Sequence, residues 1–188
     1  MEVNIQLQNA QITMDRAKII AALLKNHEAF IACIHKVPSE QWNTSHHGKW
    51  SPAQQLDHIL RSVRPVNMAL LVPKWFMRLA YGKPNRTARS FDELVQRYQE
   101  KLAKGGRASG RFVPPPSPSR SVEQMSADLR KVLDTLTKRV NSWSENDLDT
   151  ALLPHPLLGK LTVREMLYFT LYHAQHHQQL VERDYGKP

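Results

Sequence analysis

Cysteine is almost absent from this chain of 188 residues, which contains one, Cys33. A single thiol cannot build a disulfide framework within the chain, and it cannot provide a cysteine-based zinc site. Cys33 lies within an apolar helical pattern, so we expect a small buried hydrophobic side chain there. The lack of any disulfide signal fits a reducing compartment, and we expect a cytoplasmic protein.

Long apolar runs are also missing. No stretch of 18 apolar residues occurs, so we expect no membrane-spanning helix and no membrane partner. The first 16 residues carry an acid at position 2 and no apolar run, so we expect no secretory signal. With 41% hydrophobic and 23% charged residues, the composition is typical of a globular protein, and the length favours one domain over residues 1–188.

Acidic residues are scarce and unevenly placed. The chain has 17 Asp and Glu against 26 Lys and Arg, and residues 74–120 alone hold 11 of these cations and 3 of the acids. A basic segment suggests nucleic acid, but this one has no recognition-helix, RRM or KH signature, so a nucleic-acid partner is disfavoured. The segment could instead attract an anionic small-molecule substrate, or it could simply keep a loop soluble.

Apolar residues recur at helical spacing through most of the chain, with joints rich in Pro, Gly and Ser between them. The pattern predicts an all-α fold, an up-and-down four-helix bundle with an inserted short helix and a long basic loop between the second and third long helices. Exposed apolar faces on such a bundle leave a homodimer open. The expected helices span about 13–37, 51–82 with kinks at Pro65 and Pro73, 90–103, 121–143 and 162–184, and the joints at 104–120 and 144–160 are expected to be irregular.

Histidines mark the candidate site. His173 and His177 lie four residues apart on the apolar stripe of the last expected helix, so both face the core. Such a pair can bind a divalent transition metal, or it can be two core-edge histidines that hydrogen-bond to neighbours. A third ligand would have to come from another element, and periodicity favours His27 among the candidates His27, His35, His58 and His155.

Three segments resemble the DinB/YfiT-like superfamily. Residues 48–60 (GKWSPAQQLDHIL) look like the start of that superfamily's second helix, residues 156–166 (PLLGKLTVREM) resemble the start of its last helix, and residues 173–177 (HAQHH) match its H-x-x-x-H motif. The resemblance covers nearly the whole chain, although the basic middle third matches poorly. It implies a four-helix bundle with a metal site formed by His58, His173 and His177, and it selects His58 where periodicity does not.

Several members of this superfamily are thiol-dependent transferases, and others are described as metal-dependent hydrolases. The resemblance therefore implies one divalent transition metal (zinc, nickel or iron) acting on a small-molecule substrate through a metal-bound water or a low-molecular-weight thiol. A metal-binding bundle without catalysis, acting in stress or regulation, is the alternative. Side chains that could orient the ligating imidazoles are Gln54, Asp57, Tyr172 and Gln175, although Asp57 reads more simply as a solvated surface acid.

Overall fold

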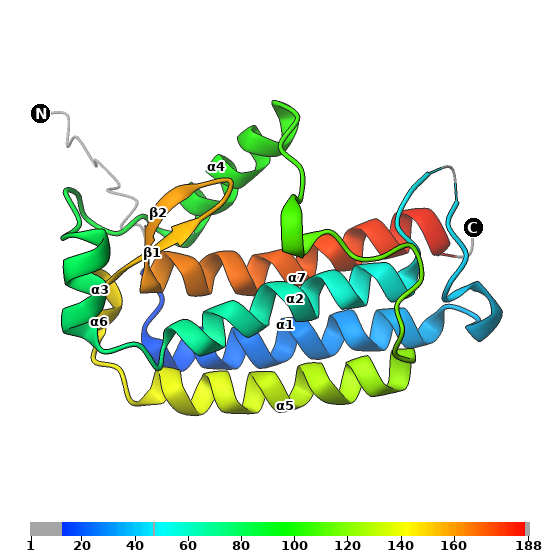
Figure 1. Ribbon diagram of the computed structural model, residues 1–188, viewed down its shortest axis with the longest axis horizontal. Coiled ribbons are helices and arrows are strands. Elements are labelled where there is room, and N and C mark those ends of the chain that lie inside the picture. The colour runs from blue at the N-terminus through cyan, green and yellow to red at the C-terminus, as the bar shows by residue number, and fades with distance from the viewer. Residues whose placement is uncertain (1–12, 47, 187–188) are drawn as a thin grey trace, which may run out of the picture.

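Helices dominate the computed structural model, which describes residues 13–46 and 48–186 (Figure 1). The expected all-α fold is confirmed in part: the structure is mostly helical, and it also contains a two-stranded antiparallel sheet. The N-terminal residues, where no secretory signal is expected, lie mostly outside the described ranges. None of the helices within the described ranges has the length and apolar character that a membrane span requires. The elements are α1 (Arg16–Lys36), α2 (Pro52–Ala69), α3 (Lys74–Tyr81), α4 (Phe91–Ala103), α5 (Val122–Asn141), α6 (Glu145–Thr150), β1 (Leu152–His155), β2 (Gly159–Thr162) and α7 (Val163–Tyr185), with short 3-10 helices η1 (Ser39–Gln41) and η2 (Gly110–Phe112).

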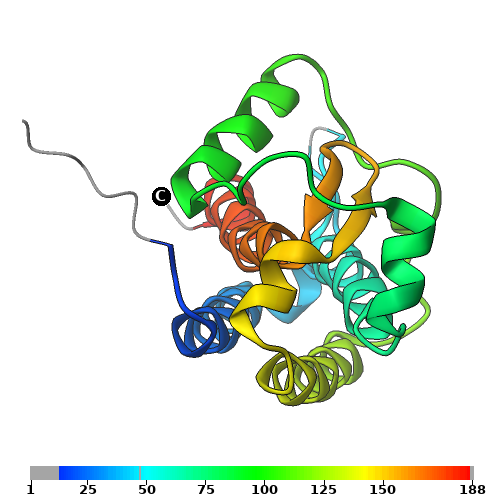
Figure 2. The ribbon, with the colours of Figure 1, turned by 90° about the vertical axis from the view of Figure 1, so that its left-hand side faces the viewer.

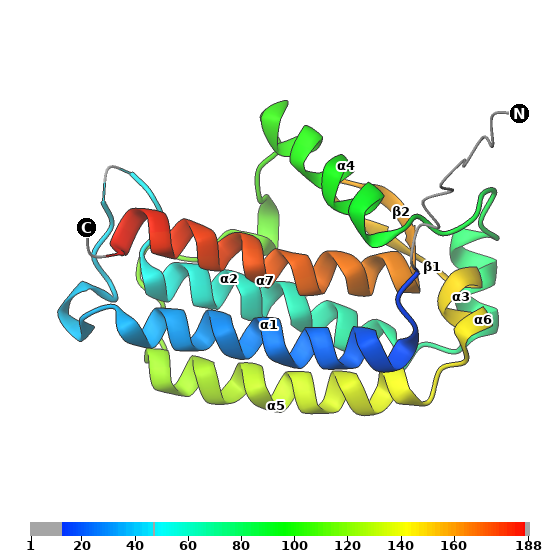
Figure 3. The same ribbon diagram turned by 180° about the vertical axis from the view of Figure 1, so that it is seen from behind.

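The four long helices α1, α2, α5 and α7 lie side by side along the molecule (Figures 1 and 3). Helices α5 and α7 each pack against both α1 and α2, and the end-on view in Figure 2 shows this arrangement. The apolar stripes of the four helices face one another and form the core. The shorter elements α3, α4, α6 and the β-hairpin gather at one end and along one side of these helices (Figures 1 and 2).

The directions of the long helices do not alternate simply. Met14, just before α1, donates its N–H to the hydroxyl of Tyr168 near the start of α7 at 2.9 Å, so α1 and α7 begin at the same end. Asn67 and Arg139, near the last turns of α2 and α5, hydrogen-bond at 2.8 Å, so these two helices end together. The order is up, down, down, up, and the expected up-and-down alternation is wrong because the segment 104–121 returns along the molecule before α5 begins (Figure 1).

Reciprocal capping boxes fix where four helices begin. In each box a Ser or Thr hydroxyl accepts the backbone N–H three residues on, and the Gln or Glu at that position accepts the N–H of the cap. This leaves little freedom for a helix to start one residue earlier or later, which would rotate its side chains by about 100°. The pairs are Ser51 and Gln54, Ser90 and Glu93, Ser121 and Gln124, and Thr162 and Glu165.

Two stretches differ from the expected helices and joints. The second helix does not continue to residue 82: α2 ends at Ala69, and α3 is a separate helix that begins after Pro73, because proline cannot continue the backbone hydrogen bonding. Pro65 lies within α2 without ending it. The joint 144–160 contains α6 and an antiparallel hairpin in which His155 pairs with Gly159, and its strands of four residues are too short to show clear alternation.

A buried carboxylate joins the basic segment to the start of α7. The side chain of Glu165 is fully buried, and it accepts two hydrogen bonds from the Arg86 guanidinium at 2.6 and 2.9 Å and one from the Arg89 side chain at 3.1 Å. Glu165 also completes the capping box of α7 by accepting the N–H of Thr162 at 2.9 Å. Two of the cations that make residues 74–120 basic are therefore used to neutralise a charge inside the protein.

Because Glu165 is buried and ion-paired, we expect the free energy of unfolding to depend on pH. Burial alone would raise the pKa of Glu165, but the hydrogen bonds from Arg86 and from the backbone N–H groups of Arg89 and Thr162 hold that pKa below the ordinary value of 4.5. Because the folded-state pKa is the lower one, the stabilisation is present above pH 4.5 and is lost as the pH falls through the folded-state value. We expect Glu165→Gln to lower the free energy of unfolding by about 3 kcal/mol at about pH 7, since it leaves two half-buried arginines without their counter-charge.

Urea unfolding of both proteins at about pH 7 and about pH 3 measures this effect. The difference between wild type and Glu165→Gln should shrink at the acidic pH, where the carboxylate is protonated. A difference of the same size at both pH values would contradict the role given to the charge.

Candidate metal centre

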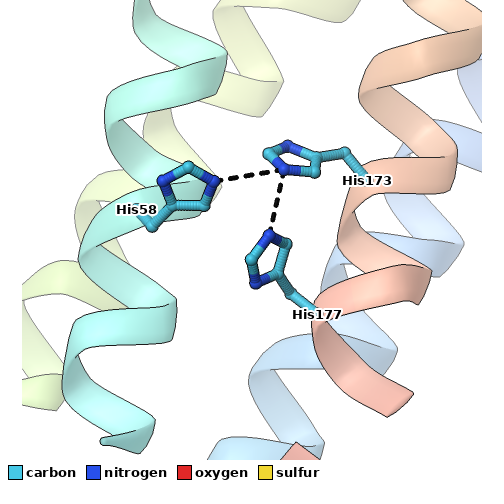
Figure 4. A group of neighbouring side chains, drawn as sticks. All are labelled: His58, His173 and His177. Carbon is cyan, nitrogen blue, oxygen red and sulfur yellow. Dashed lines mark hydrogen bonds between the residues drawn. The ribbon is translucent and has the colours of Figure 1, made fainter. Parts of the chain in front are cut away.

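Three buried histidines converge between α2 and α7 (Figure 4). The Nε2 atoms of His58 and His173 are 3.2 Å apart, and those of His177 and His173 are 3.0 Å apart. Each of the three side chains is at most 5% exposed. The structure thus brings together the three residues that the family resemblance names as metal ligands.

The local sequence explains how these side chains meet. His173 and His177 are one turn apart on α7, so their rings project from the same face. His58 projects from α2, whose start is fixed by the Ser51 capping box. Trp50, directly before that cap, packs its ring 4.9 Å from the ring of His58 and 6.3 Å from that of His177, measured between centroids. The Trp-Ser pair therefore both begins the helix and packs against two of the three histidines.

Two of the three imidazoles are oriented by acceptors on their outer sides. The Nδ1–H of His58 donates to the backbone carbonyl oxygen of Phe112 at 2.6 Å, and the Nδ1–H of His177 donates to Oε1 of Gln55 at 2.5 Å. A carbonyl oxygen only accepts, so in both rings the proton lies on Nδ1 and the lone pair lies on Nε2. Both lone pairs are directed at Nε2 of His173.

Burial favours the uncharged form of these rings. Burial lowers the pKa of His58, although the bond to the Phe112 carbonyl acts in the opposite direction. Burial and the neighbouring imidazoles lower the pKa of His173 and of His177 well below the ordinary value of 6.5. A neutral His173 can carry one proton on Nε2, and that proton can satisfy only one of the two lone pairs that face it.

At least one of the two inward-facing lone pairs is therefore left without a hydrogen donor, about 3 Å from the Nε2 atom of His173, which is unfavourable unless a cation binds it. Neutral imidazole nitrogens are good ligands for zinc, copper, iron and nickel. The donor set and its geometry thus fit a divalent transition metal.

Two of the other candidate third ligands, His27 and His35, lie outside this group. His27 is fully buried, but its Nδ1 bonds to the carbonyl of Leu23 in its own helix, at 2.8 Å. His35, in the last turn of α1, has its Nε2 atom 3.2 Å from the hydroxyl of Ser126 on α5. Periodicity favoured His27 because it identifies burial, and burial alone does not say which partner a polar ring has.

Three of the four residues expected to orient the imidazoles have other partners. Gln54 accepts within its capping box and donates to the carbonyl of Pro115 at 3.0 Å, and the hydroxyl of Tyr172 accepts from Gln99 at 2.9 Å. Asp57 is 2% exposed, so its interpretation as a solvated surface acid is wrong. Its carboxylate pairs with Arg61 at 2.5 Å and Arg120 at 3.6 Å. Within the described ranges, no hydrogen bond joins Gln54, Asp57, Tyr172 or Gln175 to the three histidines.

The sequence did not predict the two acceptors that orient His58 and His177 in the structure. Gln55 lies three residues before His58 on α2, so helical spacing could have placed it on the same side. The carbonyl of Phe112 belongs to η2 within the basic segment. A backbone carbonyl carries no signal of residue type, so nothing in the sequence identifies it.

A cavity of about 560 Å³ lies beside the histidines, with His58 and His173 in its wall. Helix α2, helix α7, the β-hairpin and the basic segment all contribute to the lining, which is mostly apolar. A volume of this size is within the range of small-molecule sites. The candidate metal centre therefore opens onto space that a small ligand can occupy.

Comparison with known proteins gives one match. The family model of the DinB superfamily matches residues 22–181, a range that includes all three histidines. No curated protein matches the chain, and no solved structure does.

The outer acceptor on His177 can be tested without any metal. We expect Gln55→Leu to lower the free energy of unfolding by about 1–3 kcal/mol in the presence of a chelator, because the buried Nδ1–H of His177 loses its acceptor. Gln175→Leu is the matched control: it changes a half-buried glutamine of α7, and we expect about 0.5 kcal/mol or less. Equal losses in urea unfolding of the two variants would show that Gln55 does not support His177.

Proposed function

The chain belongs to the DinB superfamily, and from this premise we propose that it is a metal-dependent enzyme whose divalent ion is held by His58, His173 and His177. The convergence of three buried, neutral imidazoles carries the proposal. Three protein ligands leave coordination positions open for a small molecule, as reactive metal sites require, whereas structural zinc sites are closed by four. The cavity beside His58 and His173 supports the same interpretation.

When bound, such an ion supplies Lewis acidity and lowers the pKa of a thiol or water that binds to it. We propose two reaction classes for a small-molecule substrate: transfer of a low-molecular-weight thiol to an electrophile, and hydrolysis. The chain's own part is to fix His58 through the Phe112 carbonyl and His177 through Gln55, so that both Nε2 lone pairs stay directed inward. Trp50 packs against the same two rings.

The protein offers no sulfur nucleophile of its own for this chemistry. Cys33, the only cysteine, is 7% exposed, and its thiol lies 3.9 Å from the carbonyl of Gln178. Burial raises its pKa to about 11, with a smaller contribution from Glu182, so the reactive thiolate is scarce near neutral pH. In the transferase reading, the thiol must therefore be a second small molecule.

The ligand set predicts a stoichiometry. We expect protein purified without a histidine tag and dialysed against zinc to retain about one ion per chain by elemental analysis. His58→Ala and His177→Ala should each lose most of it, because two imidazoles bind far more weakly than three. His35→Ala is the matched control, since it removes a histidine outside the group and should retain the ion. Full metal content in His58→Ala would refute the ligand set.

Catalytic activity is tested separately from metal binding. Metal-loaded protein should accelerate the reaction of a small thiol such as cysteine or bacillithiol with a chromogenic electrophile, or the hydrolysis of an activated ester. A chelator and His58→Ala should each remove the effect. If metal-loaded protein retains its ion but accelerates neither reaction, the enzyme proposal fails and the non-catalytic metal-binding alternative takes its place.

A further inference from the structure

His155 is a fourth histidine at the same cavity, and the β-hairpin carries it there. It lies at the end of β1, and its ring lines the cavity together with His58 and His173. Phe169 lies between this ring and the metal centre, with its centroid 4.2 Å from that of His155 and 4.7 Å from that of His173. The hairpin therefore adds a polar group to the wall a short distance from the three ligands.

The hydrogen bonds of His155 fix which of its nitrogens carries the proton. Its Nδ1 accepts the backbone N–H groups of Leu157 and Leu158, each at 3.1 Å, so Nδ1 is unprotonated and the proton is on Nε2. Burial lowers the pKa of His155 to about 4, so the ring stays neutral in this form near pH 7. In the part of the chain that the structure describes, the Nε2–H has no hydrogen-bond acceptor. His155 is thus an unused donor, and its lone pair is occupied.

Two arginines line the cavity on the loop after α4. The guanidinium of Arg107 donates to the carbonyl of Gly106, and that of Arg111 lies 5.2 Å from the ring of Phe112. Among the described residues neither forms an ion pair, unlike Arg86, Arg89 and Arg120 of the same basic segment. The described lining contains no carboxylate that could neutralise Arg107 or Arg111.

We propose that this cavity binds a small molecule with an apolar body and an anionic group, in which Arg107 and Arg111 attract the charge and the Nε2–H of His155 donates to an oxygen. The apolar lining contacts the body of the molecule, and two unpaired cations together with one free donor match its polar end. The inference rests on the proposed function and deepens it, because it names the substrate class of the same site.

Two fluorescent probes of the same shape test the charge. Anilinonaphthalene sulfonate is apolar and anionic, and phenylnaphthylamine has the same aromatic body without the sulfonate. We expect the double variant Arg107→Ser/Arg111→Ser to weaken binding of the sulfonate about tenfold and to reduce its salt dependence, with binding of the neutral probe unchanged. Lys104→Ser is the matched control, because it removes an exposed cation of the same loop that does not line the cavity.

Unchanged binding of the sulfonate in the double variant would overturn the proposal, and so would an equal weakening of both probes. Thermal unfolding of each variant shows whether the fold is retained. Zinc content is measured on the same samples. A wild-type protein that binds no zinc defeats the proposed function, whereas retained zinc with no preference for the anionic probe defeats this inference alone.

Two substitutions separate the donor of His155 from its part in the hairpin. In His155→Asn the side-chain oxygen replaces Nδ1 as acceptor for Leu157 and Leu158, and no group remains at the position of Nε2. In His155→Gln an N–H can occupy the Nε2 position, and the acceptor is lost. We expect His155→Asn to bind the sulfonate probe about tenfold more weakly than wild type, with little change in thermal unfolding. The His155→Gln variant should bind the probe more tightly than His155→Asn does. The reverse order of the two variants would contradict a donor role.

Discussion

The candidate site is built around an unfavourable contact, in which buried imidazole nitrogens are brought together with the lone pairs of His58 and His177 facing inward. The outer hydrogen bonds of His58 and His177 place the protons on Nδ1, and so leave the inner nitrogens as acceptors. Without a cation this contact costs free energy, which the surrounding packing and capping must offset. A divalent ion bound by His58, His173 and His177, as proposed above, would replace this contact with coordination bonds and so remove its cost.

The positions at which α2 and α7 begin determine where the three histidines meet. His58 and the α7 pair lie on helices whose first residues are fixed by capping boxes at Ser51 and Thr162. The second of these boxes uses Glu165, the carboxylate that also neutralises Arg86 and Arg89. Glu165 therefore takes part both in the capping box that begins α7 and in a buried ion pair. Because α7 carries His173 and His177, the same side chain also helps to set the geometry of the site.

Much of this could be predicted from the sequence, because capping boxes and apolar stripes are local signals. They located the helix starts, and they placed His173 and His177 on one buried face. They did not select His58, since the side of α2 that faces the site is not the centre of its apolar stripe; the family resemblance supplied that residue. The hairpin that carries His155 was missed because four-residue strands give too short a pattern. The carbonyl that orients His58 could not be foreseen, because it depends on how residue 112 folds back over α2.

The parallel course of α2 and α5 has a consequence for how such a protein can diversify. Two long helices that run the same way cannot be joined by a tight turn, so the chain needs a connection as long as the bundle itself. Here that connection passes beside the histidines and supplies Arg107, Arg111 and the Phe112 carbonyl. Part of the cavity wall is therefore encoded outside the long helices of the bundle. Mutation can reshape that part of the wall while the three histidines stay as they are.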